Sequence, residues 1–107
     1  MTPDILNRAA DIMSARGKAD TAYIDDDGSC CLVGAIWIAM HPEIAGGKCV
    51  GDVSAISRFL ARHDPVFHVT NMRNTKDESV ATLRALAATE KARAQRLLPV
   101  ISEQVHA

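Results

Sequence analysis

Residues 25–40 have the sequence DDDGSCCLVGAIWIAM, in which an acidic turn runs directly into the most apolar segment of the chain. From Cys30 to Met40 this segment carries no charge and has no polar face. A helix without a polar face is stable only where the rest of the domain covers nearly all of it. The sequence therefore predicts a mainly α fold, in which four to five helices surround a buried central helix at about residues 30–41.

Two helices are predicted in the first half of the chain. Thr2 followed by Pro3 is typical of an N-cap and a first helical residue, and apolar residues then recur at helical spacing to about Ala15. Ser29 can cap the apolar helix, which places the two following cysteines in its first turn. We expect that helix to end before Pro42, because proline disfavours the α conformation in the residue that precedes it.

Two more helices are predicted in the second half. Asp52 is suited to cap a helix that ends near residues 63–65. Thr75 and Glu78 have the spacing of a capping box, which predicts the start of a long helix. Pro99 is expected to break or kink that helix before a short terminal turn, since proline has no backbone N–H to donate.

Two short segments favour extended structure, and the remaining apolar positions predict the core. Residues 21–24 and 66–70 are rich in β-branched or aromatic side chains, which predicts at most a small β-element at each. The main core residues are expected to be Val33, Ile36, Trp37, Phe59, Leu60, Leu83 and Leu86.

The composition is that of one globular domain, residues 1–107. Hydrophobic residues make up 48% of the chain, and the net charge of -1 offers no overall attraction to nucleic acid or to an anionic membrane. The apolar segment is too short to span a bilayer and the N-terminus lacks the features of a signal peptide, so a cytoplasmic protein is predicted. Three cysteines fit free thiols in a reducing compartment better than a disulfide framework.

The motif Cys-Leu-Val-Gly-Ala-Ile at residues 31–36, followed by Asn71 and the helix start at Thr75, resembles an uncharacterised family of small α-rich proteins from actinobacteria and their phages. The resemblance covers residues 28–87. In that family the motif helix is the buried centre, and a tryptophan–asparagine–aspartate stretch often precedes the last helix. Residues 70–72 here lack the tryptophan and the aspartate. The resemblance implies an intracellular bacterial or phage origin and no particular activity.

Cysteine chemistry is one alternative function. A cysteine at a helix N-terminus can have a lowered pKa, so Cys30 or Cys31, with His68 as base and Asn71 to orient it, are the candidate catalytic residues of a hydrolase or transferase. Cysteine also packs as a small hydrophobe, and the chain lacks the several strands that hold the histidine in such enzymes. The sequence therefore favours a structural role for both thiols.

No cofactor or metal is predicted. His41, His63 and Cys49 could join the residues above as zinc ligands, but no pair has Cys-x-x-Cys or His-x-x-x-His spacing. An EF-hand that began at Asp25 would need a glutamate at its twelfth position, where this chain has Ile36. The EF-hand is therefore excluded, and a zinc site is supported only by the number of possible ligands.

A helical nucleic-acid-binding regulator is a further alternative, because basic residues recur on the last two predicted helices. On the long helix they lie toward its end, where the helix dipole already favours them, and the slightly negative net charge argues against this function. Six alanines between residues 81 and 94 could pack against a second copy and form a homodimer. The basic residues concerned are Arg58, Arg62, Arg84, Lys91, Arg93 and Arg96.

By elimination, the preferred function is protein–protein interaction by a small intracellular protein of bacterial or phage type, which acts on host physiology or defence as an accessory factor. Its partner is another protein of unknown identity. The candidate surfaces are the acidic turn and the loop at residues 68–74. The partner-binding residues expected there are Asp25, Asp26, Asp27, His68, Asn71, Arg73 and Asn74.

Overall fold

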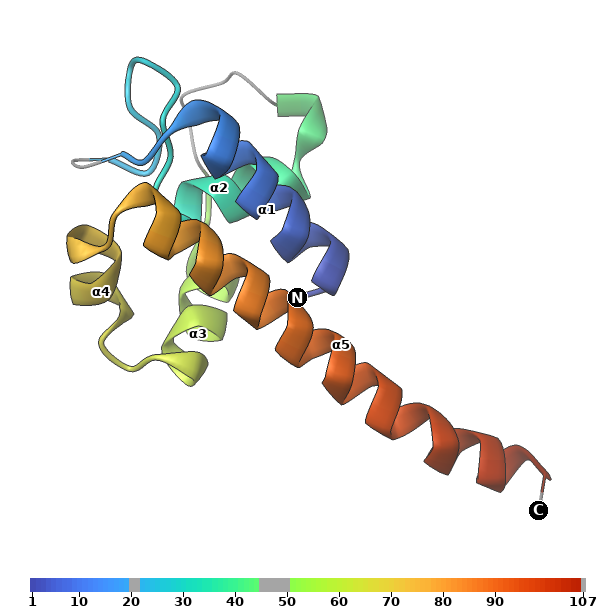
Figure 1. Cartoon of the computed structure of the whole chain (residues 1–107). Helices are drawn as coiled ribbons and strands as arrows, with labels where there is room; N and C mark the ends of the chain where they lie inside the picture. The colour runs from blue at the N-terminus through green and yellow to red at the C-terminus, as the bar shows by residue number, and fades with distance from the viewer. Residues whose placement is uncertain (20–21, 45–50, 107) are drawn as a thin grey trace.

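The computed structural model describes residues 1–19, 22–44 and 51–106 of the chain. In these ranges it contains five α-helices and one short 3₁₀ helix, joined by loops (Figure 1). The mainly α fold class is confirmed. The elements are α1 (Pro3–Arg16), α2 (Leu32–Met40), η1 (Pro42–Ile44), α3 (Ser54–His63), α4 (Phe67–Arg73) and α5 (Lys76–His106).

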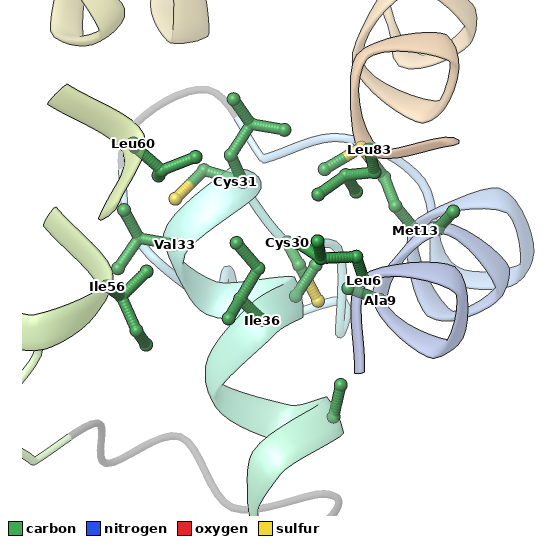
Figure 2. Close-up of a cluster of buried hydrophobic side chains, with 14 of the residues drawn as sticks. Leu6, Ala9, Met13, Cys30, Cys31, Val33, Ile36, Ile56, Leu60 and Leu83 are labelled. Carbon is green, nitrogen blue, oxygen red and sulfur yellow. The ribbon is translucent and has the colours of Figure 1, made fainter. Parts of the chain in front are cut away.

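Helix α2 is the buried centre of the fold, as its composition predicts. Every residue from Leu32 to Ala39 is buried except Trp37. Each large apolar side chain removed from water contributes about 1.5–3 kcal/mol, so this short helix is a major source of stability. Figure 2 shows α1 side chains on one side of α2 and α3 side chains on the other: Leu6, Ala9 and Met13 from α1, and Ile56 and Leu60 from α3.

The predicted core is confirmed at six of its seven positions, with Trp37 as the exception. Trp37 is half-buried against the core, and its ring centroid lies 4.2 Å from that of His41. Full burial of tryptophan is uncommon because the side chain is large. The six buried residues are Val33, Ile36, Phe59, Leu60, Leu83 and Leu86.

The loop between α1 and α2 lies directly against α2. A Cβ atom at Gly34 would lie 1.9 Å from the carbonyl oxygen of Tyr23, so the backbone could not approach this closely beside any other residue type. The same oxygen accepts a hydrogen bond from the backbone N–H of Cys31 at 3.0 Å. Gly34 therefore allows the loop to pack directly against one side of the central helix.

The two segments predicted to be extended have different outcomes. At residues 21–24, of which residue 21 lies outside the described part of the chain, Ile24 forms an isolated antiparallel bridge with Cys30. At residues 66–70 the prediction of a strand is wrong, because the chain is helical from Phe67 onward in α4. Burial of Phe67 between the helices outweighs the local β propensity of its neighbours.

The starts of α1 and α3 use the residues that the sequence indicates. Thr2 Oγ1 accepts a hydrogen bond from the backbone N–H of Ile5 at 3.2 Å. Asp52 Oδ1 accepts hydrogen bonds from the backbone N–H and the hydroxyl of Ser54, at 2.9 and 2.6 Å. Val53, rather than Asp52, occupies the N-cap position of α3, so the predicted cap is displaced by one residue.

Helix α5 begins with the predicted capping box. The backbone N–H of Glu78 donates to Thr75 Oγ1 at 3.2 Å, and the Glu78 carboxylate accepts from the N–H of Thr75 at 3.0 Å. The first half of α5 packs against α1, whereas the second half extends away from the other helices (Figure 1). The backbone stays helical through Pro99 to His106, so the predicted break and separate terminal turn are wrong. Proline removes one backbone hydrogen bond, and here the adjoining turns keep the helix continuous.

Candidate functional site

The amino end of α2 is capped by a side chain from α4. The backbone N–H of Leu32 donates to Asn71 Oδ1 at 3.1 Å. Cys31 occupies the N-cap position, but its own side chain makes no capping hydrogen bond. The predicted cap, Ser29, is wrong, because its hydroxyl instead donates to Asp27 Oδ1 at 2.6 Å. Asn71 therefore joins α4 to the start of the central helix.

Both candidate nucleophiles are buried free thiols. The exposed fraction is 0% for Cys30 and 6% for Cys31, and both precede α2 rather than lying in its first turn as predicted. Burial raises the pKa of the Cys30 thiol, with a smaller opposing effect of Arg16. The Cys30 Sγ donates to the carbonyl oxygen of Gly28 at 3.4 Å. Side chains with these properties are packing residues of the core.

His68, the candidate base, lies exposed on α4. Its ring packs against that of Phe67, with centroids 3.9 Å apart. Within the described residues, no hydrogen bond joins His68 to Cys30 or Cys31. The structure thus brings Asn71 to the start of α2 in a capping role, without a histidine bonded to a thiol there.

The acidic turn, Asp25–Asp27, is held in shape by hydrogen bonds of its own backbone and side chains. Gly28 has a φ of 89°, and its N–H donates to the Asp25 carbonyl oxygen at 2.9 Å. The Asp27 carboxylate accepts from the hydroxyl and the backbone N–H of Ser29, and these two bonds lower the pKa of Asp27 in that order. The three aspartates line an open hollow at the surface. The turn therefore presents a negatively charged, internally supported surface.

Three exposed apolar side chains lie along the outer side of α4 and just before it. Val66 is 61% exposed, Val69 48% and Met72 74%, and we call these three residues the α4 face. The inner side of the same helix is fixed by buried Phe67 and by the Asn71 cap. The sequence prediction missed this face because it expected at most a small β-element at residues 66–70 and a loop at 68–74, where the structure has α4. The three-residue spacing of the apolar positions is the signal that could have revealed it.

The α4 face and the acidic turn lie at the same end of α2. The acidic turn leads into the amino end of α2, and Asn71 brings α4 to that same end (Figure 1). Arg73 is exposed in the last turn of α4, and half-buried Asn74 ends the helix, its N–H donating to the Thr70 carbonyl oxygen at 2.9 Å. The acidic turn itself projects away from α4, so the two predicted partner-binding segments are linked only through the start of α2 (Figure 1).

The basic residues of α5 fall into two groups. Arg84 is engaged within the fold, because it pairs with Asp11 and its Nη1 donates to the backbone and side-chain oxygens of Asn7, each at 3.2 Å. This contact holds α5 against α1. The Arg84 guanidinium is therefore already bonded within the fold and contributes less to a basic binding surface. The second group is exposed farther along α5 and consists of Lys91, Arg93 and Arg96.

In the described ranges no cluster of three or more histidine, cysteine, aspartate or glutamate side chains could hold a metal ion. His41 and His63 instead lie near single carboxylates, those of Glu43 at 3.5 Å and Glu90 at 3.4 Å. Cys49, another candidate zinc ligand, lies outside the described residues. None of the helices in the described ranges has the length and apolar character needed to cross a membrane.

Comparison with known proteins adds one finding. A family model described as a family of unknown function (DUF6197) matches residues 1–95. No curated protein and no solved structure matches the chain.

Proposed function

The chain belongs to DUF6197, a family of unknown function, and we propose that it acts by binding another protein through the α4 face. The observation that carries this proposal is the exposure of Val66, Val69 and Met72 on one side of a short helix whose other side is fixed to the core. Apolar side chains of this size are normally removed from water, and a contiguous exposed set marks an interaction surface.

The support given to α4 favours a preformed recognition surface. Asn71 and Phe67 hold the helix in place, so little conformational freedom is lost when a partner binds its outer side. A short helix with apolar residues at three-residue spacing fits an apolar groove on the partner. The acidic turn is a second proposed contact in another part of the surface, and its charge suits lysine or arginine on the partner. The proposed partner is therefore a protein with an apolar groove that receives the α4 face.

The alternative functions receive less support. Burial of both thiols and the raised pKa of Cys30 argue against a cysteine-dependent hydrolase or transferase. The engagement of Arg84 with α1 reduces the basic surface that a nucleic-acid-binding regulator would use. A non-enzymatic binding protein agrees with both observations.

Site-specific photo-crosslinking in cells of the source organism tests the proposal. A photoreactive residue at Met72, and separately at Val69, should capture the same protein, whereas one at exposed Ser14 on α1 should not. The substitution Val66→Asp should abolish capture at both α4 positions, because it places a charge within the proposed apolar contact. Capture that is equal at Ser14, or that survives Val66→Asp, would contradict the role of the α4 face.

The biological setting is part of the same proposal. The sequence resemblance to proteins of actinobacteria and their phages supports a bacterial or phage origin and a cytoplasmic location. The proposed role in host physiology or defence rests on elimination of the other functions. A homodimer is supported by one exposed stripe of alanines on α5. Analytical ultracentrifugation at several protein concentrations tests the homodimer. A molecular mass equal to that of one chain at every concentration would exclude it. The alanines are Ala81, Ala85, Ala88 and Ala92.

A further inference from the structure

A hollow of about 300 Å³ lies between the start of the chain, α3 and α5. No residue of the α4 face or of the acidic turn lines it. Its volume is at the lower end of the range of roughly 300–1,000 Å³ that ligand pockets span, which favours a small molecule. The residues that line the hollow are Met1, Phe59, Arg62, His63, Glu90 and Arg93.

Two guanidinium groups from different helices border this hollow. Among the described residues, neither Arg62 of α3 nor Arg93 of α5 has a hydrogen bond or an ion pair. Two arginines elsewhere in the fold do have such partners, because Arg84 is bonded to α1 and Arg8 donates to the carbonyl oxygen of Ala39 at 2.9 Å. A guanidinium presents several N–H donors in one plane and suits oxyanions. The donors at the hollow are therefore available to a ligand.

The other groups in the lining hold this arrangement in place. The Arg62 guanidinium lies over the Phe59 ring, 6.0 Å from its centroid, and the His63 ring packs edge-on against the same phenylalanine. Glu90 supplies the one carboxylate of the lining, and its Oε1 is 3.4 Å from His63 Nε2. The two guanidiniums outnumber this one carboxylate, so the charged side chains of the lining are net positive.

We propose that this hollow binds the phosphate group of a small phosphorylated ligand. A phosphate monoester carries about two negative charges at neutral pH, which matches the two guanidiniums of Arg62 and Arg93. Its oxygens can accept paired N–H donors from both side chains at once, and such charge-assisted bonds are stronger than neutral ones. The site is independent of the α4 face, so either proposal can fail without the other.

Titration of the whole chain with pyrophosphate, and separately with inorganic phosphate, tests the site at constant ionic strength. The side-chain Nε–H signals of Arg62 and Arg93 in nitrogen-15 NMR spectra should shift and saturate together. Arg62→Gln and Arg93→Gln should each weaken binding about tenfold or more. Arg58→Gln, one turn earlier on α3, and Arg96→Gln, nearly one turn later on α5, are the matched controls and should change it less than about twofold.

Each result bears on the proposal. Saturable shifts that are lost in both pocket variants and kept in both controls support it, and backbone spectra of the variants verify that they remain folded. Shifts that grow linearly without saturation would overturn the proposal. An equal loss of binding affinity in all four variants would also overturn it. Either result indicates that the ligand responds to a diffuse positive field rather than to a site. Tighter binding of a DNA duplex, with shifts that extend to Arg58 and Arg96, would replace the small ligand with a nucleic-acid backbone.

Discussion

The side-chain oxygen of Asn71 lies 3.1 Å from the backbone nitrogen of Leu32, so a residue of α4 caps a helix that begins 39 residues earlier. A helix start leaves four backbone N–H groups without partners inside the helix. At α2 this need is acute, because Leu32 is buried and Cys31 supplies no side-chain acceptor. This hydrogen bond gives one of those N–H groups a partner and also holds α4, with the α4 face, against the start of α2.

Removing this cap should destabilise the protein. Asn71→Ala is expected to lower the free energy of unfolding by about 1–2 kcal/mol, the upper part of the usual range for a lost N-cap. Asn71→Asp keeps an oxygen acceptor and adds a charge that the helix dipole favours, so it should recover most of the loss. Asn74→Ala is the matched control and should stay within about 0.5 kcal/mol. Denaturant unfolding followed by circular dichroism measures all three, and equal losses at positions 71 and 74 would contradict the capping role.

Local signals in the sequence predict much of the fold. The capping box of Thr75 and Glu78 needs residues three apart, and a local pattern of this kind is visible in the sequence alone. The apolar run of α2 likewise predicts its own burial, since no face of it suits water. These elements agree with the structure because their cause lies within a few residues.

Contacts distant in sequence account for what was missed. Asn71 reaches Leu32 only because α4 packs across the start of α2, and α4 itself is helical where β-branched residues favour a strand. In the same way, Arg62 and Arg93 belong to different helices and border one hollow only because the fold brings His63 of α3 close to Glu90 of α5. The candidate surfaces could therefore be named by segment, but the residues that shape them could not.

Gly34 is expected to tolerate no side chain. In Gly34→Ala the new Cβ would lie 1.9 Å from the Tyr23 carbonyl oxygen, and the loop backbone would have to move away from α2. We expect a loss of about 3 kcal/mol or more in the free energy of unfolding. Gly28→Ala is the control for backbone strain without a clash. Gly28 has a φ of 89°, but nothing lies within 4 Å of the Cβ that the substitution adds. Gly28→Ala should lower the free energy of unfolding by about 1–2 kcal/mol. Thermal and denaturant unfolding measure both variants. A loss at Gly34 as small as that at Gly28 would show that no clash occurs.

The capping box should contribute a pH-dependent part of the stability. Hydrogen bonds from Thr75, first from its backbone N–H, lower the pKa of Glu78 below its ordinary value of 4.5. As the pH falls, the Glu78 carboxylate is therefore protonated in the unfolded chain before it is protonated in the folded protein. The stability that the ionised Glu78 carboxylate contributes is fully present above pH 4.5. It is lost as the pH drops through the lower pKa of Glu78 in the folded protein.

Glu78→Gln isolates this effect, because glutamine keeps an oxygen acceptor but does not titrate. Between pH 7 and pH 3 the melting temperature of the parent protein should fall more steeply than that of the variant. Asp27 and Asp52 also have lowered pKa values and remain in both proteins, so the difference between the two curves reports Glu78. A difference in melting temperature that stays constant through the acid range would contradict the prediction.

The buried thiols should react slowly in the folded protein. Alkylation of Cys30 and Cys31 requires local opening, and an opening free energy of about 3 kcal/mol slows the reaction roughly 100-fold relative to the unfolded chain. The raised pKa of Cys30 slows it further at neutral pH, since the thiolate is the reactive form. Mass spectrometry of peptides after timed alkylation, in buffer and in denaturant, measures each rate on the same residue. Reaction of either cysteine in buffer as fast as in denaturant would show an accessible thiol and restore the case for cysteine chemistry.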